Sequence, residues 1–77
     1  MTIERAFGLT LKKLRQEKGL SQEILASHSG FHRTYISLLE RGAKSPSLST
    51  LDRLSQALDI SLSELVDAIE KQTVNKR

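Results

Sequence analysis

Apolar residues recur along this chain at the three- and four-residue spacing of amphipathic helices, and almost never alternate as they do in a strand. The pattern predicts five short helices and no strand. We expect them at about residues 3–18, 22–29, 32–41, 48–58 and 62–71. The chain is therefore expected to be all-α, with one compact five-helix domain over residues 1–71. Residues 72–77 lack this periodicity and are expected to form a flexible C-terminal tail.

Residues with known preferences for helix ends support these boundaries. Hydroxyl side chains that can act as N-caps precede the predicted helices at Thr2, Ser21, Ser47 and Ser61. Glu64 follows Ser61 at the spacing of a capping box. Glycines stand where three of the helices should end, at Gly19, Gly30 and Gly42. Gly8, in contrast, falls inside the first helix and has no explanation in the sequence.

A chain of 77 residues is the size of a single domain, and its composition excludes several kinds of site. Without cysteine it has no disulfide, thiolate zinc site or cysteine nucleophile. His28 and His32 are four residues apart, but Gly30 interrupts the helix between them and no third ligand is near, so we expect no metal. No serine is accompanied by a base and an orienting acid. We therefore expect neither enzymatic activity nor a cofactor or small-molecule ligand.

The cellular location of the protein can also be predicted from the lengths of its apolar runs. None approaches the roughly 20 residues that a membrane helix needs, and the first residues lack the apolar stretch of a signal peptide. A cytoplasmic protein without membrane partners is therefore expected.

The charged residues are unevenly distributed along the chain, whose net charge is +3. Residues 1–45 carry eight basic and four acidic side chains, whereas residues 46–70 carry one basic and five acidic ones. This asymmetry favours a polyanionic partner on one side of the molecule. A solvated surface of mixed charge would give the same count, so charge alone leaves both interpretations open.

The stretch from residue 22 to residue 41 has the spacing of a helix-turn-helix. Ala26 supplies the small side chain that two crossing helices need at their contact. Gly30 supplies a residue that tolerates positive φ in the turn. Ile36, helped by Leu39, supplies the apolar anchor of the second helix.

Several short runs make this match specific. They are Ser21-Gln22-Glu23, Leu25-Ala26, Gly30-Phe31, Tyr35-Ile36-Ser37, Leu39-Glu40-Arg41-Gly42 and Pro46-Ser47-Leu48. Together they resemble the phage repressor and Cro type helix-turn-helix family over about residues 7–70. Within it, the run from Arg33 to Ser37 and the small size resemble controller proteins of restriction–modification systems. The resemblance implies a transcriptional regulator that binds a palindromic double-stranded DNA operator as a dimer.

In such a protein the helix at about residues 32–41 enters the major groove. Arg33 is expected to donate two hydrogen bonds to a guanine, and Thr34 and Ser37 to contact neighbouring bases. His32 either reads a base or only begins the helix, and Leu38 either touches a thymine methyl or makes no base contact. Contacts to the DNA backbone are expected from Gln22, Tyr35, Arg41, Lys44 and Ser45.

The resemblance also implies an ion pair between Glu40 and Arg15, because an acid facing DNA would be repelled. The apolar stripe of the last helix either closes the core or forms a homodimer interface through Leu62, Val66 and Ile69. A second possible function is that of a protein-interaction module, such as an antitoxin or an anti-repressor partner. The modest net charge and the apolar Leu38 favour that alternative.

Overall fold

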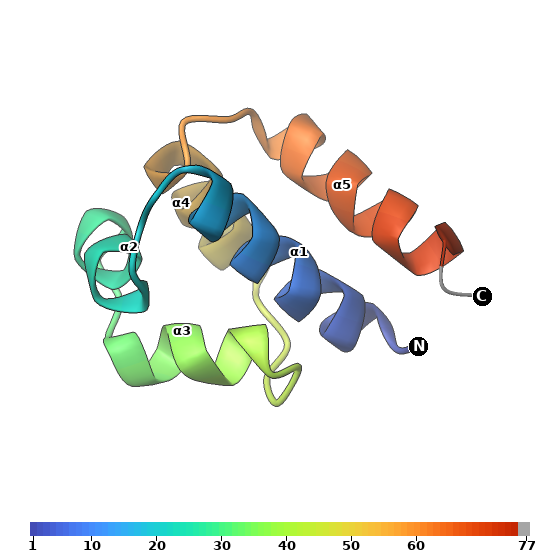
Figure 1. Cartoon of the computed structure of the whole chain (residues 1–77), viewed down its shortest axis with the longest axis horizontal. Coiled ribbons are helices and arrows are strands. Elements are labelled where there is room, and N and C mark those ends of the chain that lie inside the picture. Colours follow the sequence, from blue (N-terminus) through green and yellow to red (C-terminus); the bar gives the residue numbers. More distant parts are fainter. Residues whose placement is uncertain (76–77) are drawn as a thin grey trace.

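Five α-helices make up most of residues 1–75, the part of the chain that the computed structural model describes (Figure 1). They are α1 (Ile3–Glu17), α2 (Gln22–Ser29), α3 (Arg33–Glu40), α4 (Leu48–Ala57) and α5 (Leu62–Asn75). No strand occurs within those residues. The all-α prediction is confirmed, and the first four helices begin and end within one residue of the predicted positions.

Hydroxyl side chains cap four of the helices, as the sequence predicts. Thr2, Ser21 and Ser47 each accept a hydrogen bond from a backbone amide in the first turn, at 3.0–3.1 Å. Ser61 and Glu64 form a reciprocal capping box, with both bonds 3.0 Å long. The hydrogen bonds from the Ser61 backbone amide and hydroxyl also lower the pKa of Glu64.

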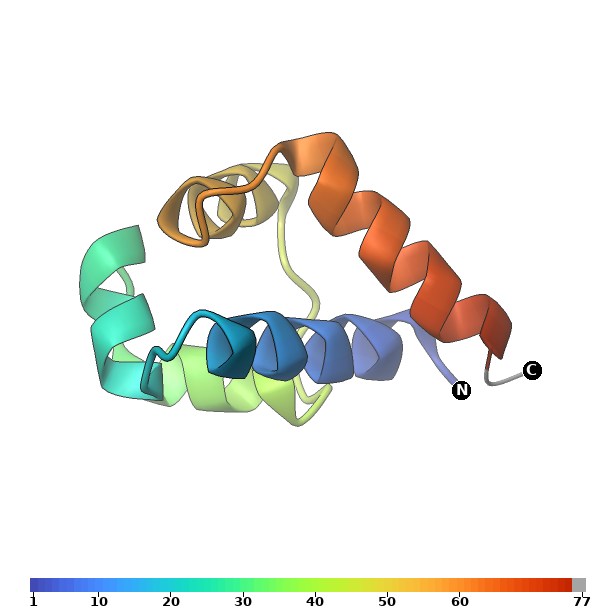
Figure 2. The same ribbon diagram turned by 45° about the horizontal axis from the view of Figure 1, so that its top comes forward.

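The core lies where α1 packs against α3 and α5, and where α4 packs against α2 and α5. In Figure 2, α1 and α3 run side by side in one layer, with α4 and α5 above them. The side chains that form the core come from all five helices. They are Ala6, Phe7, Leu11, Leu25, Ala26, Ile36, Leu39, Leu54, Leu58, Leu65 and Ile69.

Gly8 is explained by a close approach between α1 and the end of α3. A Cβ atom at this position would lie 2.5 Å from the carbonyl oxygen of Glu40 and 2.6 Å from that of Leu39. Both contacts are with backbone, which cannot move aside as a flexible side chain can. Glycine therefore lets α1 lie directly against the C-terminal turn of α3, and so fixes where α3 sits.

The predicted end of the last helix at Lys71 is wrong, because α5 continues to Asn75. The Thr73 hydroxyl donates to the carbonyl of Ile69 at 3.0 Å, and Gln72 and Thr73 are half-buried. Tertiary packing beside Ile3 thus extends a helix that local periodicity does not predict. Of the expected tail, residues 76 and 77 lie outside the described part of the chain.

None of the helices in residues 1–75 is long and apolar enough to cross a membrane.

Candidate nucleic-acid interface

The turn between α2 and α3 has the geometry of a helix-turn-helix. Gly30 ends α2 in the left-handed conformation, with φ 76° and ψ 24°. The amide of Phe31 then donates back to the carbonyl of Ala26 at 2.9 Å, which closes the turn. Ala26 and Ile36 are 4% and 0% exposed at the helix contact. These are the roles that the spacing predicts for the three residues.

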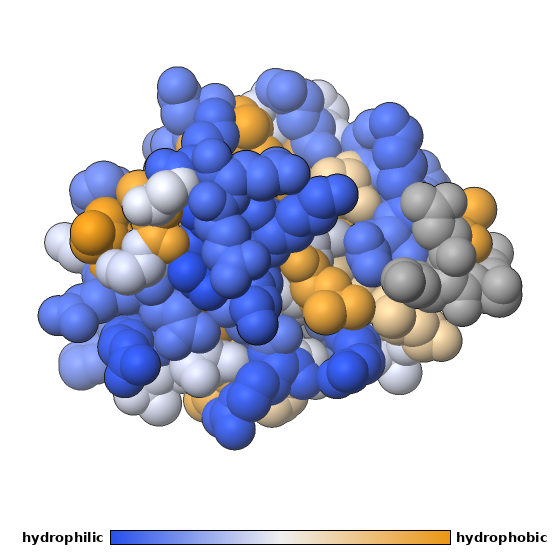
Figure 3. Space-filling model, in the orientation of Figure 1, coloured by the Kyte–Doolittle hydropathy of each residue, from blue (hydrophilic) through white to orange (hydrophobic). Residues whose placement is uncertain are grey.

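One face of α3 is buried and the opposite face is open. Ile36 and Leu39 are fully buried, whereas Arg33 and Thr34 are exposed in the first turn. Ser37 lies one turn further along and is half-buried. Positions i, i+1 and i+4 of a helix share a face, so these three polar side chains form one surface. In Figure 3 the lower edge of the molecule, along α3, shows hydrophilic side chains between paler and some hydrophobic ones.

The sequence left open the roles of His32 and Leu38, at the start of α3 and within it. His32 is exposed but is the N-cap of α3 rather than part of it, with extended backbone and no side-chain capping bond. It therefore stands at the entry to the polar face. Leu38 is half-buried.

The side chain of Tyr35, which is expected to contact the DNA backbone, also has partners within the protein. The side chain is half-buried, and its ring packs on Phe31 with centroids 5.0 Å apart. The hydroxyl oxygen lies 3.4 Å from Oγ1 of Thr50 on α4. Either oxygen can be the donor, so the Tyr35 hydroxyl can accept from Thr50 and still donate its own hydrogen to a phosphate. The expected backbone contact therefore stays a prediction.

The ion pair between Arg15 and Glu40 is present and nearly enclosed. Nε and Nη2 of Arg15 donate to the two carboxylate oxygens at 2.6 and 3.0 Å, and the two side chains are 10% and 4% exposed. Nη1 donates to the carbonyl of Leu20 at 2.8 Å. Nε2 of Gln22 donates to the same carboxylate at 3.0 Å. The pair thus connects α1 and the loop after it with the start of α2 and the end of α3.

Gln22 therefore has a structural partner that the sequence did not predict. Its side-chain amide carries two hydrogens, and Glu40 takes one of them. The second hydrogen and the start of α2 remain for a phosphate, so the expected backbone contact stays a prediction.

The remaining residues expected at the DNA backbone lie in the segment between α3 and α4. Arg41, Lys44 and Ser45 are all exposed. They follow the open face of α3 along the chain and bring two positive charges to its C-terminal end.

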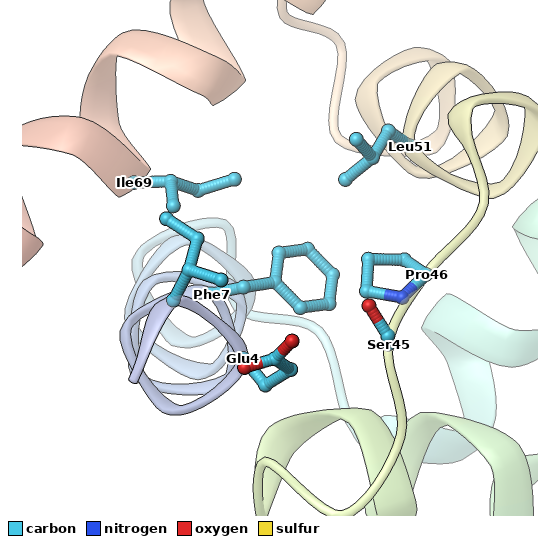
Figure 4. A pocket seen from close by; sticks show the side chains of 7 residues that line it. Glu4, Phe7, Ser45, Pro46, Leu51 and Ile69 are labelled. Carbon is cyan, nitrogen blue, oxygen red and sulfur yellow. The ribbon is translucent and has the colours of Figure 1, made fainter. Parts of the chain in front are cut away.

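The apolar residues expected at a dimer interface are placed unequally. Val66 is 47% exposed and Leu62 is half-buried, but Ile69 is only 6% exposed. Ile69 points into a hollow of about 170 Å³ that Phe7, Leu51 and Pro46 also line (Figure 4). Ile69 thus belongs mainly to the core, because α5 turns this position toward α1.

Other apolar side chains are exposed beside Val66. Ile3 and Val74 are 55% and 56% exposed, and together with Val66 they surround a shallow hollow between the start of α1 and the end of α5. The predicted dimer interface did not include these two residues, each of which lies at the end of a helix.

Within residues 1–75, no group of three or more His, Asp or Glu side chains is placed to hold a metal ion.

A comparison with protein families identifies the class to which this geometry belongs. The family model described as helix-turn-helix matches residues 11–65, and the chain belongs to that family. This agrees with the resemblance to the phage repressor and Cro type. The protein is a helix-turn-helix transcriptional regulator.

Among the similar proteins are controller proteins of restriction–modification systems. The control protein C.MunI of a Mycoplasma species is 48% identical over 71 residues, which cover 91% of this chain and 96% of that protein. The controller protein C.AhdI of Aeromonas hydrophila superposes with a TM-score of 0.78 at 47% identity, over 80% of this chain and 94% of that one. The C.Esp1396I tetramer, solved in complex with its natural 35-base-pair operator, gives a TM-score of 0.88 at 30% identity, with coverages of 96% and 97%.

Proposed function

We propose that this protein binds a palindromic operator in double-stranded DNA as a homodimer and acts as the controller of a restriction–modification system. The observation that carries DNA binding is the exposure of Arg33 and Thr34 on a helix whose opposite face is fully buried. Such a helix presents its polar side chains to a partner at a fixed angle. The major groove of B-DNA is wide enough to admit it. The similarity to the controller proteins C.MunI and C.AhdI supports the controller role.

Sequence is read by the first turns of α3. The planar guanidinium of Arg33 matches O6 and N7 of a guanine, and the hydroxyls of Thr34 and Ser37 reach adjacent base edges or phosphates. His32 stands beside Arg33 at the N-terminus of the helix. This placement supports a contact at the edge of the same half-site.

Contacts to phosphates position the helix without reading sequence. Arg41, Lys44 and Ser45 lie beyond one end of α3, and Gln22 begins α2 at the other side of the motif. Held at both sides, α3 can enter the groove in only one register.

The Lys44→Ala variant is expected to bind every duplex more weakly by about the same factor. Because a phosphate contact releases roughly one counterion, the slope of log affinity against log salt should fall by about 1. Fluorescence anisotropy at several salt concentrations measures both quantities. Lys71→Ala removes the same charge from α5 and serves as the control, with little change expected. Equal effects of the two variants would contradict a local backbone contact.

Dimer formation is proposed because one recognition helix buries too little surface for tight, specific binding. The exposed Val66, with Leu62, Ile3 and Val74 near it, supplies an apolar surface on the side of α5. Two copies would place their recognition helices in half-sites about 34 Å apart.

Sedimentation equilibrium at micromolar concentration should therefore give twice the 8.6 kDa chain mass. Val66→Glu should shift the protein to the monomer, because it places a charge in the apolar interface. Ile24→Glu makes the same change at a comparably exposed position on α2 and should leave the dimer intact. A wild-type protein that sediments as the monomer would contradict the proposed dimer.

The alternative is a protein-interaction module that uses the same fold. The half-buried Leu38 on α3 and the net charge of only +3 favour it. Selection of bound sequences from random duplexes separates the two functions. A regulator should select a palindrome, whereas an interaction module should select no preferred sequence.

A further inference from the structure

Arg53 on α4 bonds to the turn of the helix-turn-helix. Its Nε donates to the carbonyl of Ser29 at 3.0 Å, and its Nη2 donates to the carbonyl of Gly30 at 2.8 Å. The last carbonyls of a helix have no partner within the helix and carry its negative dipole end. A guanidinium therefore suits this position both as a donor and as a cation.

The same guanidinium lies over the first aromatic residue after the turn. Cζ of Arg53 is 4.0 Å from the centroid of the Phe31 ring, the geometry of a cation–π contact. Phe31 in turn packs on Tyr35, whose hydroxyl meets Thr50 of α4. Helix α4 thus holds the start of α3 at two points, through Arg53 and through Thr50.

Gly30 leaves room for the Arg53 side chain beside the turn. A Cβ atom on Gly30 would lie 2.5 Å from Nη2 of Arg53. A larger residue at this turn would therefore displace the flexible tip of the Arg53 side chain from its two carbonyl partners. Arg53 is also the only basic residue between positions 46 and 70, a segment with five acidic residues.

We infer that Arg53 is a positioning residue for operator recognition. It fixes the angle at which α3 leaves the turn, and so aligns Arg33 with its base pair. The inference rests on the proposed function, since it concerns the same recognition helix. Lysine cannot replace arginine here, because an ammonium lacks the planar fork that spans two carbonyls while stacking on a ring.

The test compares Arg53→Lys with Arg5→Lys. Arg5 is an exposed arginine on α1 whose guanidinium makes no hydrogen bond to the described residues, so the control makes the same chemical change without loss of an anchor. Arg53→Met, which keeps an unbranched stem over Phe31 but no charge, is the second variant. For each protein we would measure the melting temperature, amide exchange at Gly30 and Phe31, and affinity over a salt series. The duplexes are the one selected by the wild-type protein and an unrelated one.

Arg53→Lys is expected to reduce the ratio of specific to non-specific affinity about tenfold, the loss expected when one bidentate base contact is misaligned. Amide exchange at the turn should become faster, while the salt slope and the affinity for the unrelated duplex should not change. Arg53→Met should show the same pattern more strongly, and Arg5→Lys should match the wild type.

Three results would overturn the inference. A lower melting temperature with an unchanged specificity ratio would mean that Arg53 only stabilises the fold. A salt slope reduced by about 1, with weaker binding to both duplexes, would make Arg53 a phosphate contact instead. A wild-type protein that prefers no duplex would overturn the proposed function itself, and this inference with it.

Discussion

Glu40→Gln is expected to lower the free energy of unfolding by about 3 kcal/mol, a loss typical of removing one partner from a buried ion pair. The Arg15 side chain is 10% exposed and would keep its charge without a carboxylate to neutralise it. The carboxylate also accepts the hydrogen bond from Gln22, so the variant disturbs three bonds at once. Urea denaturation followed by circular dichroism measures the change.

The exposed ion pair between Asp67 and Lys71 provides a control within the same chain. Its side chains are 56% and 72% exposed, and such pairs contribute little because water and salt screen them. Asp67→Asn should therefore change the stability by less than about 0.5 kcal/mol. An effect of Glu40→Gln as small as that of the control would show that the buried pair does not hold the motif together.

The starts of all five helices and the ends of the first four could be predicted, because they depend on local chemistry. A hydroxyl before an apolar repeat satisfies free amides of the first turn wherever the helix later packs. The helix-turn-helix could be predicted for the same reason. At fixed spacing, Ala26 meets a requirement for a small side chain, Gly30 one for positive φ and Ile36 one for burial. These features need only a short window of sequence.

Features that depend on distant parts of the chain could not be predicted in this way. Gly8 makes room for carbonyls of α3 that lie about thirty residues away in sequence. The last turn of α5 forms because it packs beside α1, and the hydroxyl of Tyr35 turns toward Thr50 on α4. The sequence marks Arg53 only as a single basic residue in an acidic segment. Its hydrogen-bond partners become apparent only when α4 is placed beside the turn.

Arg33→Ala is expected to weaken binding to the selected duplex by about 2 kcal/mol per half-site, roughly thirtyfold, the discrimination that one bidentate arginine–guanine contact gives. Its side chain is exposed and is not part of the core, so the stability of the protein should change little. Binding to unrelated duplexes should fall much less, by the contribution of one surface charge. Anisotropy titrations with both duplexes, alongside urea denaturation, separate these effects.

The most direct test of base reading by α3 is a profile of affinities across the operator. Each base pair of the duplex selected by the wild-type protein is replaced in turn, symmetrically in both half-sites, and binding is measured with the wild type and with Arg33→Ala. One guanine position is expected to be strongly discriminated by the wild type and to lose that discrimination in the variant, while the other positions keep theirs. Identical profiles for the two proteins would contradict base reading by Arg33.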